Sequence, residues 1–68
     1  MIRDERIKIF IEMKRKVHVN CGSRFYNGVV LELNSEKQFI ILMDIKLGEL
    51  PIMIEDIISI EPYMEERK

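Results

Sequence analysis

The chain has few side chains that could carry out covalent chemistry. His18 and Cys21 are its only imidazole and its only thiol. His18 has no serine, cysteine or acid at a spacing that would make a nucleophile–base pair. Two such ligands rarely suffice for a zinc site, and no glycine-rich phosphate loop occurs. The sequence therefore predicts a protein that is not an enzyme and that needs no metal or cofactor.

The acidic side chains show no paired arrangement for acid–base work either. They fall at the ends of the expected strands, where they are interpreted as solubility charges: Asp44, Glu49, Glu55, Asp56 and Glu61. A lone cysteine is typical of a reducing compartment. The N-terminus lacks the uncharged stretch of a signal peptide, and no apolar run is long enough to cross a membrane. A cytoplasmic protein is expected.

Arg24, Phe25 and Tyr26 place a cation beside two aromatic rings. Such a set can stack on the bases of a single strand, but it is also the ordinary content of a strand with one core face and one partner-facing face. Residues 1–16 carry six basic and three acidic side chains, whereas residues 17–68 carry five basic and nine acidic ones. The acidic body disfavours binding of nucleic acid through phosphates alone.

Periodicity predicts one helix followed by five strands. Acidic residues at the start and basic residues at the end of the first segment match a helix dipole, and from Val17 onward the apolar period becomes two. The expected elements are a helix over residues 4–15 and strands over 17–20, 24–33, 38–44, 50–54 and 57–61. Gly28 is expected to mark a bulge or a bend, and Pro51 to lie at the start or the free edge of its strand.

These elements predict a single all-β domain over residues 1–68, a five-stranded SH3-like barrel with an N-terminal helix. An OB barrel usually has a helix between its third and fourth strands, and only a short turn is expected there. The run from Phe39 to Met43 is apolar throughout, so both faces of that strand need cover. One phase, either Phe39, Ile41 and Met43 or else Ile40 and Leu42, is expected to fill the barrel. The other is expected beneath the helix or against another copy.

Residues 17–44, VHVNCGSRFYNGVVLELNSEKQFIILMD, resemble the first motif of the Sm-like superfamily, which includes the Sm and Lsm proteins and bacterial Hfq. Val17 and Val19 open the motif, Gly22 ends the turn, and the stretch from Gly28 leads to Asn34, where the family prefers Asp. The later segment LPIMIEDIISIEP is similar to the end of that fold in its apolar register and its closing proline.

The resemblance implies an Sm-type barrel and a protein that binds RNA without catalysis. The family's recognition loop falls on Ser35, Lys37 and Gln38, and these residues are the candidate RNA contacts together with Arg24 and Tyr26. An ordinary solvated turn is the alternative for this loop. The family's second motif, Ile-Arg-Gly, is replaced here by the residues at 52–54, Ile-Met-Ile, so an RNA-binding arginine is missing.

The resemblance also implies a homo-oligomeric ring of roughly five to seven copies. We expect strand 50–54 of one copy to pair with strand 57–61 of the next, which hides two free edges. The pairing would also bury four isoleucines that a monomer is not expected to be able to cover all at once: Ile52, Ile54, Ile58 and Ile60. The competing hypothesis is an oligomeric SH3-like scaffold, or a protein-interaction module, that does not bind RNA.

Overall fold

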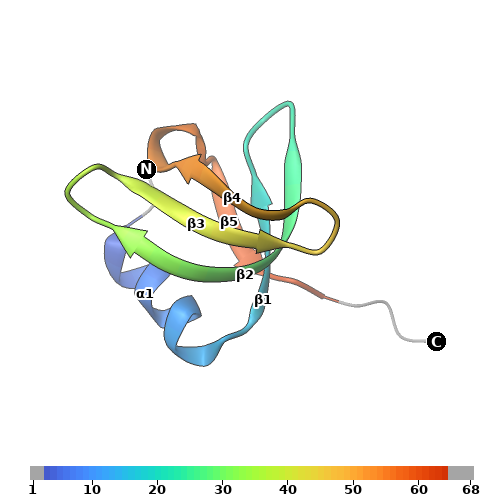
Figure 1. The fold of residues 1–68 in the computed structure, drawn as a ribbon, viewed down its shortest axis with the longest axis horizontal. Helices are drawn as coiled ribbons and strands as arrows, with labels where there is room; N and C mark the ends of the chain where they lie inside the picture. Colours follow the sequence, from blue (N-terminus) through green and yellow to red (C-terminus); the bar gives the residue numbers. More distant parts are fainter. Residues whose placement is uncertain (1–2, 65–68) are drawn as a thin grey trace.

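The computed structural model describes residues 3–64 as one helix, five strands and a short 3-10 turn (Figure 1). In chain order these are α1 (Asp4–Met13), β1 (Lys16–Asn20), β2 (Phe25–Asn34), β3 (Phe39–Asp44), β4 (Gly48–Met53), η1 (Ile54–Asp56) and β5 (Ser59–Pro62). The helix ends two residues before the expected position because Lys14 adopts a left-handed conformation, φ 52°, and donates its N–H to Ile11 O.

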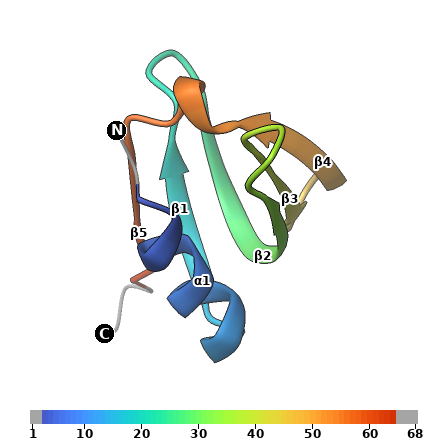
Figure 2. The ribbon, with the colours of Figure 1, turned by 90° about the vertical axis from the view of Figure 1, so that its left-hand side faces the viewer.

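The five strands form one antiparallel sheet in the order β4-β3-β2-β1-β5. The prediction of a mostly β chain with five strands and an N-terminal helix is thereby confirmed. The sheet is strongly curved but open, with β4 and β5 as its two edges (Figure 2). The helix α1 lies at the open side of this curve, below the long strand β2.

The concave face of the sheet and the helix share one apolar core. Its members are all at least nine-tenths buried: Ile7, Phe10, Val17, Val19, Val30, Ile40, Leu42, Ile52, Ile54, Ile57 and Ile60. In β3 the inward phase is therefore Ile40 and Leu42. The helix contributes to this same core, so it does not cover the second phase; of the two expected covers, the other copy of the chain stays a prediction. The second phase lies on the outer face, where Phe39 and Ile41 are half-buried and Met43 is exposed.

Gly28 allows the backbones of β2 and β3 to approach each other closely. The bulge in β2 occurs further along, between Val30 and Glu32, where the register with β3 shifts. A Cβ atom at Gly28 would overlap the carbonyl oxygen of Met43 and would lie 2.9 Å from the Cα of Asp44. Only a residue without a side chain lets the backbone of β3 come this near.

Asp44 is a buried structural residue, which corrects its interpretation as a solubility charge. Its side chain is 7% exposed. One carboxylate oxygen accepts the N–H of Asn27, and the other accepts the N–H groups of Lys46 and Leu47 at 2.8 and 2.9 Å. Burial alone would raise the pKa of Asp44, but these three donors and the Lys46 charge outweigh it, so the pKa is lowered.

The free edge of β4 lacks one backbone N–H donor, at Pro51. Ile54 donates its N–H to Gln38 O at 3.0 Å, and antiparallel pairs alternate between bonded and non-bonded positions. Pro51, three residues before Ile54, therefore directs its nitrogen away from β3 and toward the edge. This confirms the expected edge position of Pro51, and it removes one N–H from the row that another strand would need.

The free edge of β5 is blunted in the same way. Tyr63 donates its N–H to Lys16 O at 2.9 Å, so the preceding residue, Pro62, directs its nitrogen away from β1. Two residues earlier, the carbonyl oxygen of Ile60 accepts a hydrogen bond from Arg6 Nη2 at 3.3 Å. Both edges of the sheet thus carry a proline, and on β5 the helix also occupies one acceptor.

Candidate nucleic-acid interface

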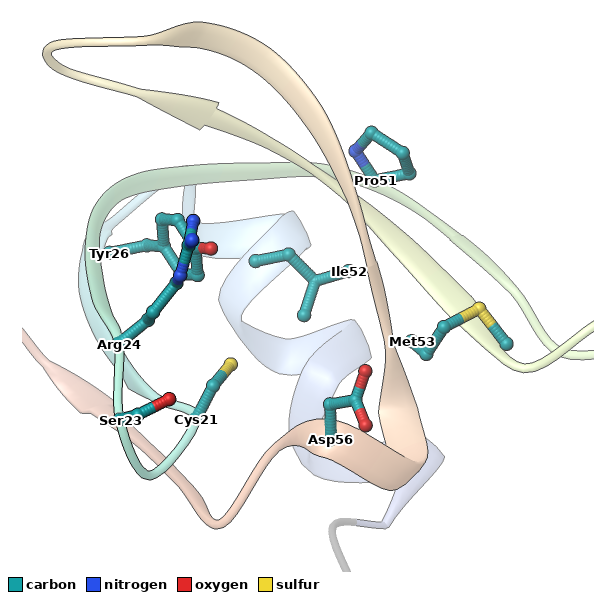
Figure 3. A pocket seen from close by; sticks show the side chains of 8 residues that line it. All are labelled: Cys21, Ser23, Arg24, Tyr26, Pro51, Ile52, Met53 and Asp56. Carbon is teal, nitrogen blue, oxygen red and sulfur yellow. The ribbon is translucent and has the colours of Figure 1, made fainter.

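A pocket of about 380 Å³ opens between the β1–β2 turn, β4 and η1 (Figure 3). It is lined by Cys21, Ser23, Arg24, Tyr26, Pro51, Ile52, Met53 and Asp56. These residues come from three segments that are distant in sequence and that the curvature of the sheet brings together. A pocket of this size is within the range of small-ligand sites.

The β1–β2 turn positions the first wall. Asn20 Oδ1 accepts the N–H of Gly22 at 2.8 Å, and Cys21 donates its N–H to Arg24 O at 2.9 Å. Gly22 has φ +89°, which only glycine adopts without strain. The closed turn presents Arg24 beside the half-buried ring of Tyr26, and both side chains border the pocket in Figure 3.

The second wall is the β4–η1 junction. Ile52 is 6% exposed and points from β4 into the space between Tyr26 and Asp56, so the floor is apolar. Asp56 ends η1 and directs its carboxylate into the pocket from the side opposite Arg24. Neither charged side chain forms a hydrogen bond or an ion pair with any residue from 3 to 64. The pocket therefore has two exposed charges of opposite sign that have no hydrogen-bond or ion-pair partner among the described residues.

Cys21 lies between these walls. Burial raises the pKa of the Cys21 thiol, and the negative charge of Asp56 raises it further. The thiol is therefore the neutral form at physiological pH, and it acts as a small, weakly polar part of the lining.

The candidate RNA-binding residues Ser35, Lys37 and Gln38 lie in the β2–β3 turn and do not line this pocket. Lys37 donates its backbone N–H to Asn34 Oδ1 at 2.8 Å, which is ordinary turn chemistry. Gln38 has φ 60°, and its Nε2 donates to Ser35 O at 2.7 Å. The Gln38 amide thus has one of its hydrogen bonds within the loop, while the Lys37 side chain is exposed.

The structure brings the predicted RNA residues together in two groups. Arg24 and Tyr26 share the pocket, and the loop residues lie around Gln38, whose carbonyl oxygen is bonded to Ile54 N. Met53 connects the two groups. It lines the pocket, and it pairs with Phe39, the first residue after the loop. The β4–η1 junction is therefore the shared border of both groups.

Three of the four predicted interface isoleucines are covered by the chain itself. Ile52, Ile54 and Ile60 are at most 6% exposed, so these three do not need a second copy to be buried. The curved sheet folds β4 and β5 over one core, which the alternating pattern alone did not reveal. Ile58 is the exception, with 66% of its side chain exposed next to Gly22.

Sequence reasoning missed Asp56, Ser23 and Cys21 as parts of this pocket. Asp56 was interpreted as a solubility charge and Cys21 only as a sign of a reducing compartment, and no spacing signal links residue 21 to residue 56. His18 contacts two residues of β2: its Nδ1 lies 2.6 Å from Asn27 Oδ1, and its ring stacks on Phe25. Within residues 3–64, no group of three His, Cys, Asp or Glu side chains is arranged to hold a metal ion.

The comparisons with known proteins leave the family open. No protein-family model, curated protein or solved structure matches this chain. In the part of the chain that the structure describes, no helix is long and apolar enough to span a membrane.

Proposed function

We propose that the protein binds single-stranded RNA without catalysis and that one nucleotide occupies the pocket between the β1–β2 turn and η1. The observation that carries this proposal is that Arg24 and Tyr26, both singled out by their residue types, share a pocket with Asp56, which has no hydrogen-bond or ion-pair partner among residues 3–64. Ile52 forms the apolar floor of this pocket. RNA-binding proteins hold unstacked bases in this manner, with an aromatic or guanidinium plane against the base and polar groups at its edges.

The second group of candidate residues extends this site along a strand of RNA. Lys37 is exposed in the β2–β3 turn, on the other side of the β4–η1 junction. A nucleotide next to the one in the pocket would bring its phosphate toward this ammonium group. Because the body of the protein is acidic, binding would depend on these few cations and would weaken moderately with salt.

The resemblance to Sm-like proteins supports the same proposal. The strand order β4-β3-β2-β1-β5, the N-terminal helix and the short turn between β4 and β5 are consistent with an SH3-like barrel of the Sm type. Within that resemblance, the loop at Lys37 and the segment at Met53 correspond to the family's two RNA-binding segments. The chain departs from the family at Met53, where the arginine is missing, and Arg24 provides a guanidinium from the other wall.

The ring of five to seven copies stays a prediction of the resemblance. Two free edges, β4 and β5, favour such an assembly. Pro51 and Pro62 oppose it, because each removes a donor from the edge that would pair. All eight lining residues of the pocket come from one chain, so the proposed site does not require a ring.

A protein-interaction module is the second candidate function. The outer face of β3 and β4 carries adjacent apolar pairs, Met53 with Phe39 and Pro51 with Ile41, and Met43 and Met53 are about two-fifths exposed. A partner protein with a flat apolar face would fit this surface. Pro51 and Met53 also line the pocket, so such a partner would cover one wall of the pocket without needing Arg24.

Fluorescence anisotropy with labelled seven-nucleotide RNAs tests the proposed function. We expect binding that weakens with salt, and a loss of affinity of about tenfold for Arg24→Ala and a smaller loss for Lys37→Ala. Lys46→Ala is the matched control, since Lys46 is an exposed lysine in the β3–β4 turn and does not line the pocket. Absence of binding at low salt, or equal losses in all three variants, would favour the interaction module.

A further inference from the structure

We infer that the pocket selects guanine among the four bases. The inference rests on the proposed function, because it names the base that the same site would hold. It is carried by the two charged groups that lie on opposite sides of the pocket, the Arg24 guanidinium and the Asp56 carboxylate.

The carboxylate sets the first requirement. An ionised Asp56 accepts hydrogen bonds and donates none. The Watson–Crick edge of guanine offers two adjacent donors, N1–H and N2–H, which match the two oxygens of a carboxylate. Uracil offers a single donor between two carbonyl oxygens, and those oxygens would repel the carboxylate. Adenine and cytosine each offer one amino group beside an acceptor nitrogen.

The guanidinium sets the second requirement. Arginine pairs with the O6 and N7 acceptors of guanine in a bidentate manner, and this is its commonest specific contact with bases. Adenine has an amino group in place of O6, so it would place a donor against a donor. Guanine alone satisfies Asp56 with one edge and Arg24 with the neighbouring edge.

The remaining lining suits the flat part of the ligand. Ile52 gives an apolar floor, the half-buried Tyr26 ring lies beside Arg24, and Cys21 carries a neutral thiol. Both charged side chains are exposed in the free protein. A bound base would replace water at both of them, so a base with the wrong edge would exchange hydrogen bonds to water for a mismatched contact. The pocket thus discriminates through the hydrogen bonds that these two side chains can form with the base.

The shared chemistry is the guanine base, either in RNA or in a free nucleotide such as GMP. The experiment titrates the full chain with GMP, IMP, AMP, UMP and CMP, and with oligo(U) RNAs that contain one guanosine, inosine or adenosine. Binding is measured by anisotropy and by protection of Cys21, the only thiol of the chain, from alkylation. We expect guanosine to bind at least tenfold more tightly than adenosine, and inosine, which lacks the amino group, to lose about tenfold.

Asp56→Asn tests the inference on the protein side, and Glu55→Gln is its control, since Glu55 is the preceding exposed residue outside the pocket lining. We expect Asp56→Asn to reduce the preference for guanine over adenine to about twofold or less and Glu55→Gln to leave it unchanged. RNA binding without a base preference would overturn the inference and leave the proposed function standing. Binding of GMP but not of RNA would support the guanine site and overturn the RNA function, and binding of neither would overturn both.

Discussion

The carboxylate of Asp44 in β3 accepts a hydrogen bond from the backbone N–H of Asn27 in β2, at 3.1 Å. Its second oxygen holds the turn that leads to β4, through Lys46 and Leu47. A single buried side chain therefore ties the β2–β3 pair to the start of the next hairpin. Two predictions concern this residue.

Replacement of Asp44 by alanine should destabilise the fold by about 1–3 kcal/mol, because three backbone donors lose their acceptor at a buried position. Urea unfolding followed by circular dichroism measures the change. Glu49→Ala, at an exposed position in β4, is the control and should shift the free energy of unfolding by less than about 0.5 kcal/mol. Equal effects in the two variants would show that the Asp44 hydrogen bonds contribute nothing.

The stabilising effect of Asp44 should disappear in acid. Its pKa in the folded chain lies below its ordinary value, so its contribution is fully present above the ordinary pKa and is lost as the pH falls through the folded-state pKa. The difference in stability between the unmodified chain and Asp44→Asn should therefore be larger at pH 7 than at pH 3. A difference that stays constant, or grows in acid, would contradict the lowered pKa.

Gly28→Ala should cost about 3 kcal/mol or more, because the added methyl group would overlap the carbonyl of Met43. Gly48→Asn is a useful contrast. Gly48 has φ +83° with open space around it, and asparagine tolerates this conformation at small cost. Thermal unfolding of both variants should rank Gly28→Ala far below Gly48→Asn, and the opposite order would contradict the close approach of β3.

Cys21 should react slowly with thiol reagents at pH 7. Burial and then the charge of Asp56 raise its pKa, and the thiolate is the reactive form. Asp56→Asn should lower the Cys21 pKa and speed alkylation at pH 8, although burial keeps part of the shift. The rate measured from pH 6 to pH 10 gives the pKa directly, and a value at or below that of an ordinary thiol would contradict the arrangement.

We expect native mass spectrometry at micromolar concentration to show a single copy of 8.2 kDa, because each free edge lacks one N–H donor and a continuous ladder between copies would be interrupted there. Restoring both donors with Pro51→Val and Pro62→Val should raise the mass by self-association. Ile45→Val, at an exposed position in the β3–β4 turn, is the control. A closed ring of the unmodified chain would contradict the edge argument and would support the assembly that the Sm-like resemblance implies.

Local patterns predicted one helix and five strands in the right order, with the change of apolar period at Val17 marking the first strand. The last two strands were expected at residues 50–54 and 57–61, whereas the structure has Gly48–Met53 and Ser59–Pro62 with η1 between them. The curvature of the sheet could not be read from these patterns. It depends on how far β2 bends and on the bulge after Val30, and these features decide which residues meet across the concave side.

The pocket illustrates the same limit. Arg24 and Tyr26 stood out because a cation next to aromatic rings is a recognisable combination. Asp56 did not stand out, since a single acid at a corner is common, and only the fold brings it opposite Arg24. Residue type thus identified one wall of the site, and tertiary structure was needed to identify the other.

The prolines of the two edge strands have a consequence beyond assembly. Many sheets recruit extended segments of other proteins by adding them as an extra strand, a mode in which the main chain provides most of the affinity. With Pro51 on one edge and Pro62 on the other, this sheet is a poor template for such segments, including partly unfolded copies of itself. The edge prolines thus reduce the chance that unrelated polypeptides add a strand to β4 or β5 and obstruct the pocket.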